Sequence, residues 1–117
     1  MSVFTSAVLQ GLNAVSSLDG LSIPVQSIDT AEVVGATPQV MQRILHKLSR
    51  AGIITVKRGP GGGFRITEEQ LRTKRVKDVL EALGQPVFAP EGSRASDRIQ
   101  QAFYDTCDIS LAEFFSK

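Results

Sequence analysis

The sequence predicts a mainly α-helical protein that carries one small β-hairpin. Three observations support this fold class. Apolar residues recur at three- and four-residue spacing in several separate stretches, as they do along amphipathic helices. Gly and Pro interrupt these stretches at positions that end helices. A β-branched run and an alternating run flank a glycine-rich segment, as two strands joined by a loop would.

The first helix is expected from Ser2, a good N-cap, to about Ser17. Its apolar stripe has helical spacing and consists of Phe4, Val8, Leu12 and Val15. Asp19-Gly20 ends this helix, and residues 21–25 then form a short connection that contains a proline.

The next two helices follow each other closely. The first is capped by Gln26 or Ser27, turns Ile28, Ala31 and Val34 toward the core, and ends at Gly35. Thr37 is a good N-cap for the next helix, and Pro38 suits its first position. This helix is expected to run to Ser49 or Arg50. Two helices separated by about three residues, one of them glycine, form the helix-turn-helix pattern.

The helix from Pro38 has two distinct faces. Four apolar residues at helical spacing are expected in the core: Met41, Ile44, Leu45 and Leu48. Another side carries Gln39, Gln42, Arg43 and His46, and Lys47 and Arg50 extend its positive charge. Gln can bond adenine and Arg can bond guanine in a bidentate manner, so this face matches base edges. The alternative is an ordinary hydrated helix face. His46 has no second ligand near it in the sequence that would favour a metal site.

A hairpin is expected directly after the helix-turn-helix. Strands over residues 53–56 and 64–67 flank the loop in R-G-P-G-G-G-F-R-I, residues 58–66. Glycines let the backbone of such a loop approach a partner closely. The combination predicts a winged helix. A nucleotide-binding loop is the alternative, but the Lys-Ser/Thr of a P-loop does not follow, and the loop lies in a hairpin.

The C-terminal third is expected to be helical. A turn of helix is expected over residues 68–72. The next helix is capped by Thr73 and ended by Gly84, and its apolar stripe consists of Val76, Val79, Leu80 and Leu83. A further helix starts near Ala95 and is broken at Asp108-Ile109. Ser110 and Glu113 form a capping box for a last short helix. The expected organisation is residues 1–84 as the winged helix, 85–94 as a linker and 95–117 as two C-terminal helices.

The charged residues are distributed unevenly, although the formal net charge is only +1. Residues 1–41 contain no Lys or Arg, whereas residues 42–77 contain ten of them against two acids. A basic block between acidic flanks favours a polyanionic partner, and solvated helix faces are the alternative. The apolar runs are too short to cross a membrane, and the N-terminus lacks a basic signal-peptide region. We therefore expect a cytoplasmic protein.

One motif carries a family resemblance. Residues 48–66, L-S-R-A-G-I-I-T-V-K-R-G-P-G-G-G-F-R-I, resemble the bacterial winged-helix regulators that include the iron–sulfur cluster regulator, the nitrite/nitric-oxide-sensing repressor and a cysteine-metabolism repressor. R-I-L at 43–45 and V-K-D-V-L-E-A-L at 76–83 are also similar to that family. The tail D-I-S-L-A-E-F-F at 108–115 resembles it more weakly. The resemblance covers roughly residues 25–115.

The resemblance implies a homodimer that binds an imperfect palindrome in double-stranded DNA. The implied DNA-binding residues are Thr37, Gln39, Val40, Gln42, Arg43, His46, Lys47, Lys57, Arg58, Gly59, Gly61 and Gly62. The helix near residue 95 would then be a dimerisation helix. The implied dimer interface contains Ile99, Ala102, Phe103, Ile109, Leu111 and Phe114.

The chain departs from the family pattern in three respects. Residues 84–98 lack the three cysteines that hold a cluster in many members, so no cofactor is expected. The first helix lacks basic residues, which puts its phosphate contacts in doubt. Gln39, Val40 and Gln42 occupy positions that vary among members, so the operator sequence does not carry over. Cys107 is expected to be a buried structural residue, with a redox-active thiol as the alternative.

These observations predict a sequence-specific transcriptional regulator that acts as a dimeric repressor. The alternative is a winged-helix module that binds proteins, or a regulator that a protein partner controls. An enzyme is not expected, because no Ser-His-Asp, Cys-His or paired-carboxylate arrangement is visible and the chain has one His and one Cys.

Overall fold

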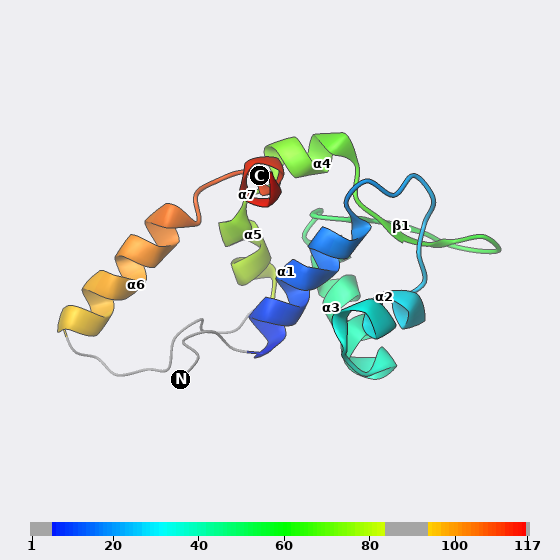
Figure 1. Ribbon diagram of the computed structural model, residues 1–117, viewed down its shortest axis with the longest axis horizontal. Helices are drawn as coiled ribbons and strands as arrows, with labels where there is room; N and C mark the ends of the chain where they lie inside the picture. The colour runs from blue at the N-terminus through cyan, green and yellow to red at the C-terminus, as the bar shows by residue number, and fades with distance from the viewer. Residues whose placement is uncertain (1–5, 84–93, 117) are drawn as a thin grey trace.

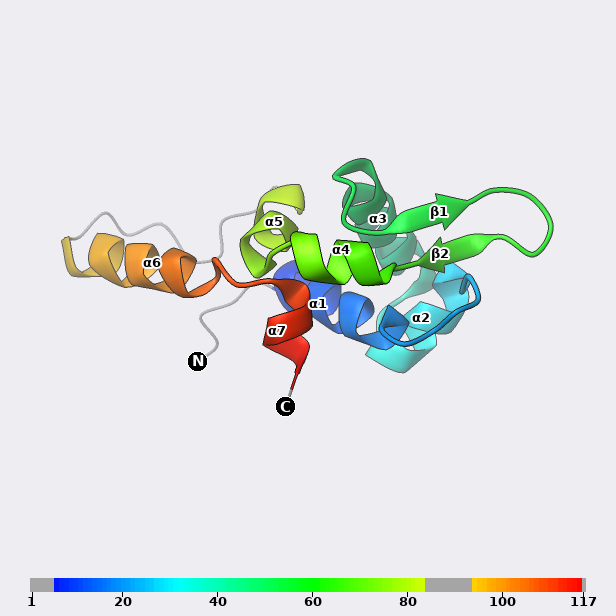
Figure 2. The same ribbon diagram turned by 90° about the horizontal axis from the view of Figure 1, so that it is seen from above.

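The computed structural model describes residues 6–83 and 94–116 of the chain. In chain order its elements are α1 (Ser6–Leu18), α2 (Ser27–Val34), α3 (Pro38–Arg50), β1 (Thr55–Lys57), β2 (Gly63–Arg65), α4 (Glu68–Thr73), α5 (Val76–Ala82), α6 (Arg94–Thr106) and α7 (Leu111–Phe115). The hairpin projects at one end of the molecule and α6 lies at the other, with the remaining helices between them (Figures 1 and 2). The predicted fold class, mainly helical with one hairpin, is confirmed.

The core forms where α1, α2, α3 and α5 pack together. The predicted apolar face of α3 is confirmed, since its four apolar residues, Met41, Ile44, Leu45 and Leu48, are all buried. Val8 and Val15 of α1 are fully buried, as their spacing predicted, and Leu12 packs against the core. Ser2 and Phe4, which were predicted to begin the first helix, lie outside the described residues.

Helix α2 begins and ends as predicted, and two of its three predicted core contacts are confirmed, since Ala31 is buried and Val34 packs against the core. Gln26 is its N-cap, and Gly35 adopts a left-handed conformation with φ of 85° at its C-cap. The prediction that Ile28 faces the core is wrong, because this side chain is 56% exposed, whereas Thr30 is only 1% exposed. In so short a helix, contact with α1 and α3 decides the buried face, and it selects Thr30 and Ala31.

The strands are shifted relative to the prediction. Ile53 and Ile54 are buried but precede β1, and β2 starts one residue before Phe64. The antiparallel register pairs Thr55 with Arg65 and Lys57 with Gly63. Val25 pairs with Phe64 on the other side of β2 through two backbone hydrogen bonds of 2.8 and 2.7 Å. The connection before α2 therefore anchors the hairpin, and no local sequence pattern predicted this contact.

The C-terminal segment returns to the body of the protein after α6. Three backbone hydrogen bonds of 2.8–3.0 Å join residues 74–77 to residues 107–111, and α7 packs against α4. The carboxylate of Asp108 lies 3.3 Å from the cationic groups of Arg75 and Lys77. These side chains are about half exposed, so the ion pairs add little stability beyond the backbone bonds.

Three predictions for the C-terminal helices have clear outcomes. The turn of helix after Thr67 is confirmed as α4, and Ser110 caps α7 by accepting a hydrogen bond from the Glu113 amide at 3.1 Å. The prediction that Thr73 caps the next helix is wrong, because Thr73 is the last residue of α4 and Arg75 is the N-cap of α5. Gly84 and most of the predicted 85–94 linker lie outside the described residues, so the domain boundaries stay a prediction.

Candidate nucleic-acid interface

Helix α3 presents one continuous polar stripe to solvent. Six exposed side chains at helical spacing line a shallow hollow along it: Gln39, Gln42, Arg43, His46, Lys47 and Arg50. The helix contains no acidic residue. The predicted set of base-reading side chains thus lies together on one surface. Arg50 belongs to the same stripe, and its position four residues after His46 was the sequence signal for it.

The N-terminus of α3 is fixed by a local cap. The hydroxyl of Thr37 accepts a hydrogen bond from the Val40 amide at 3.3 Å, and Pro38 occupies the first turn. This arrangement satisfies one amide that the helix itself leaves unbonded and sets where the helix begins. Val40 is half-buried and packs against the core, so less of its side chain than of Gln39 or Gln42 is open to a ligand.

Two residues of the α3 stripe also contact other elements. The His46 ring meets Phe64 of β2 edge-on, with centroids 5.6 Å apart and an interplanar angle of 89°. This contact joins the polar face of α3 to the base of the hairpin. The ammonium of Lys47 donates to the carbonyl of Leu83 at 3.5 Å, at the C-terminus of α5. Lys47 was expected only to bind DNA, and no sequence pattern indicated this second contact.

The tip of the hairpin carries two cations and a glycine-rich turn. Lys57, Arg58, Gly59 and Gly61 are exposed. Gly59 and Gly61 have φ of 90° and 72°, in the left-handed region that favours glycine. A Cβ at Gly62 would overlap the carbonyl oxygen of Lys57 and lie 2.8 Å from that of Gly59. Steric constraints therefore explain these glycines, and they leave the turn with few side chains.

The residues predicted for a dimer interface lie in different environments. Helix α6 stands apart from the helical body (Figures 1 and 2). Ala102 and Phe103 lie on α6, and Ile109 follows it. Ala102 is exposed, whereas Phe103 and Ile109 are half-buried. Phe114 of α7 is 46% exposed. The inclusion of Leu111 is wrong, because its side chain is fully buried in the core of the single chain. Ile99 lies on α6, but its side chain is outside the described part of the structure.

Cys107 is a buried residue that follows α6. Its side chain is 5% exposed, and burial raises the pKa of the thiol. The neutral thiol is therefore the stable form, and thiolate chemistry is disfavoured. The expectation of a buried, structural cysteine is consistent with this environment.

In the part of the chain that the structure describes, no three His, Cys, Asp or Glu side chains gather into a set that could hold a metal ion. Nor does any helix within those ranges combine the length and apolar character needed to cross a bilayer.

The fold and this surface define a winged-helix protein of the DNA-binding type. The chain belongs to the Rrf2 family, whose model is described as an iron-dependent transcriptional regulator and matches residues 4–115. This is a family of transcriptional regulators and not of enzymes, as the sequence predicted. The resemblance noted in the sequence is thereby confirmed.

Curated relatives are regulators too. The transcriptional regulator IscR of Photobacterium profundum is 36% identical over 56 residues, or 48% of this chain and 31% of that protein. A protein of Azotobacter vinelandii, provisionally named an HTH-type transcriptional regulator, is 29% identical over 99 residues, or 80% of this chain. The chain spans only 60% of the length of the Azotobacter protein.

Solved structures share the fold at low sequence identity. Staphylococcus aureus CymR superposes with a TM-score of 0.76 at 20% identity, covering 97% of this chain and 98% of that one. T. potens IscR superposes with a TM-score of 0.67 at 20% identity, covering 92% of this chain and 79% of that one.

The iron in the family description can be tested against the donors present. Cys107 is the single cysteine of the chain, and it is buried. A cluster held by three cysteines therefore lacks its ligands in this chain. The residues of this chain do not fit that group.

Proposed function

We propose that the chain is a sequence-specific transcriptional repressor that binds an imperfect palindrome as a homodimer, in the cytoplasm and without an iron–sulfur cluster. The observation that carries this proposal is the surface formed by the α3 stripe and the hairpin. Six polar side chains along α3 point outward together, and His46 links them to β2. A helix with such a face fits the major groove, where base edges present distinct donors and acceptors.

In this proposal the helix and the hairpin have separate roles. Gln39, Gln42 and Arg43 read bases, while Lys57 and Arg58 contact the backbone or the minor groove. The glycine turn between the strands has few side chains and allows a close approach to phosphates. Arg58 is exposed at the base of this turn and is free to enter a narrow minor groove, where the potential is most negative.

The dimer part of the proposal rests on α6. This helix stands apart from the helical body, and Ala102 and Phe103 lie on it near the return to the body. Two copies joined through α6 would present two α3 helices to one side of the duplex. A palindrome is read when the two recognition helices lie about one DNA turn apart, near 34–36 Å.

The replacement of Arg58 by Ala tests the proposed wing contact. We expect weaker binding to a selected operator, and a plot of log affinity against log salt that is less steep by about 1.8, because the dimer loses one phosphate contact from each of its two subunits. Arg94→Ala on α6 is a matched control that removes the same charge outside the surface. Affinity titrations at several salt concentrations measure both quantities. Equal slopes for Arg58→Ala and wild type would contradict the contact.

The second candidate, control by a protein partner, is favoured by the exposed face of α2. Ile28 and Val33 are 56% and 74% exposed, and the acidic residues Asp29 and Glu32 lie between them on the same face. Exposed apolar side chains gathered on one helix indicate an interaction surface. An Ile28→Ser, Val33→Ser variant that keeps operator affinity in vitro but loses repression in cells would support this candidate. Unchanged repression would contradict it.

A further inference from the structure

The hairpin is held at its base from two directions. On the side of β2, Val25 and Phe64 exchange backbone hydrogen bonds. On the side of β1, the contacts come from one side chain of α4, that of Gln70, which is half-buried. A hairpin of three residue pairs is marginally stable alone, so these contacts decide how it lies on the body of the protein.

The Gln70 amide forms three hydrogen bonds to three separate segments. Its oxygen accepts from the Thr67 amide at 3.0 Å and from the Thr55 hydroxyl at 3.2 Å. Its nitrogen donates to the carbonyl of Gly52 at 3.2 Å. The Thr67 amide can only donate and the Gly52 carbonyl can only accept, so these two partners fix which end of the Gln70 amide is the oxygen. The position therefore requires a side chain that accepts and donates at once.

These partners lie where the hairpin joins the helices on either side of it. Gly52 follows the last turn of α3, and its amide donates to the Ser49 carbonyl at 3.0 Å, so its position is tied to that helix. Thr55 is the first residue of β1, and Thr67 is the N-cap of α4 after β2. Gln70 therefore connects the end of α3 with the strand that enters the hairpin and with the helix that leaves it.

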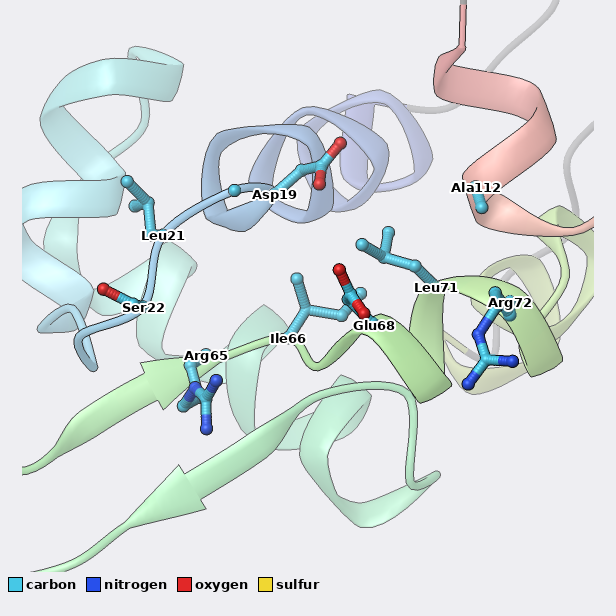
Figure 3. A pocket seen from close by; sticks show the side chains of 10 residues that line it. Asp19, Leu21, Ser22, Arg65, Ile66, Glu68, Leu71, Arg72 and Ala112 are labelled. Atoms are coloured by element: carbon cyan, nitrogen blue, oxygen red, sulfur yellow. The ribbon is translucent and has the colours of Figure 1, made fainter.

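Helix α4 is itself a fixed support. Leu71 is buried, and the carbonyl of Lys74, directly after the helix, accepts from the Leu111 amide at 2.8 Å. Figure 3 shows β2 continuing through Ile66 into α4, with Ala112 of α7 on the side of α4 that carries Leu71. A contact with α4 therefore restrains the hairpin instead of moving with it.

We propose that Gln70 is a positioning residue that sets the angle between the hairpin and α3. Val25 pairs with β2, and the bonds of Gln70 to Gly52 and Thr55 prevent the hairpin from turning about that strand. Arg58 lies three residues beyond Thr55. That is about 10 Å along an extended chain, so a rotation of about 10° at the base moves Arg58 by about 2 Å. The consequence for DNA rests on the proposed function, whereas the angle itself does not.

The Gln70→Glu substitution tests the angle in the full protein without DNA. The carboxylate still accepts from the Thr67 amide, so the capping box of α4 is kept, because Glu and Gln both serve at that position. It cannot donate to Gly52, and one of its oxygens would face the Gly52 carbonyl. Asn13→Asp is the matched control, because it makes the same change of amide to carboxylate at an exposed position of α1.

Residual dipolar couplings of the weakly aligned, ¹⁵N-labelled protein give the orientation of the hairpin relative to α3. We expect residues 55–65 to depart from their wild-type orientation relative to residues 38–50 in Gln70→Glu, and Asn13→Asp to match wild type. Thr55→Val removes the bond to β1 without adding charge, suits a strand, and should also change the orientation. A wild-type hairpin orientation in both Gln70→Glu and Thr55→Val would overturn the proposal.

The consequence for DNA is measured separately. Gln70→Met removes the three bonds without adding charge and should weaken operator binding at least about threefold, as expected for residues that act through one network. In the Arg58→Ala background the same substitution should change affinity less than about twofold, whereas a general loss of stability would weaken binding in both backgrounds. An equal loss in the two backgrounds would overturn the positioning role. An altered hairpin orientation in a protein that selects no operator would contradict the proposed function alone.

Discussion

Gly63 is the glycine on which the position of the hairpin depends. Its φ is 151°, and a Cβ there would lie 2.6 Å from the carbonyl oxygen of Val25. Val25 and Phe64 exchange two backbone hydrogen bonds at this point. The Gly63→Ala substitution would therefore push the strand away from Val25 and separate the hairpin from the segment that anchors it.

The cost follows from these contacts. Two backbone hydrogen bonds are worth about 1 kcal/mol each, and a strained backbone costs about 1–3 kcal/mol. We expect Gly63→Ala to lower the free energy of unfolding by about 3–5 kcal/mol, which is the sum of the two bonds and the strain. Gly61→Ala is the matched control, because its φ is 72° and nothing lies within 4 Å of the added Cβ. That variant carries only the left-handed penalty of about 1–2 kcal/mol.

Urea denaturation gives the free energy of unfolding for both variants and the wild type. Hydrogen exchange at the Val25 and Phe64 amides reports whether the two bonds persist. We expect faster exchange at both amides in Gly63→Ala and little change in Gly61→Ala. Equal destabilisation by the two substitutions, with protected Val25 and Phe64 amides in both, would show that Gly63 does not hold the hairpin against Val25.

Three further predictions concern other parts of the chain. Thr30→Val should raise the free energy of unfolding by about 1 kcal/mol, because within the described residues the buried Thr30 hydroxyl has no hydrogen-bond partner; a clear loss of stability in urea denaturation would contradict this. Burial raises the pKa of Cys107 above that of the unfolded thiol, so the free energy of unfolding should fall as the pH rises through the folded pKa. The Cys107→Ser variant should show a smaller fall of the free energy of unfolding at alkaline pH, measured by denaturation at several pH values. Gln39→Ala or Arg43→Ala should relax base preference at one operator position by about 1–3 kcal/mol, and an unaltered consensus in a binding selection would remove that residue from the reading set.

Local patterns predicted much of the fold because they act over a few residues. The N-cap at Thr37 and the apolar stripe from Met41 to Leu48 fix α3 by hydrogen bonding and burial alone. The glycine-rich turn is equally local, since its φ values require glycine at particular positions. The polar stripe on α3 could therefore be predicted residue by residue before any tertiary contact was known.

Features that depend on distant contacts escaped prediction. Val25 pairs with Phe64 although 39 positions of sequence separate them, and no local pattern marks that bridge. The buried face of α2 is selected by α1 and α3, which is why Ile28 was misplaced. Leu111 was assigned to a dimer surface through the family resemblance, whereas its side chain lies in the core of its own chain through contacts that no local pattern reveals.

Selection of bound fragments from genomic DNA by the purified protein tests the claim that the chain binds a palindromic operator as a homodimer. We expect enrichment of one imperfect palindrome whose half-sites are centred about 10–10.5 base pairs apart, as two copies of α3 related by a two-fold axis require. Arg43→Ala should weaken that enrichment at a single symmetric position in each half-site. Recovery of DNA with no shared sequence, or of an unpaired half-site bound by a monomer, would contradict the claim.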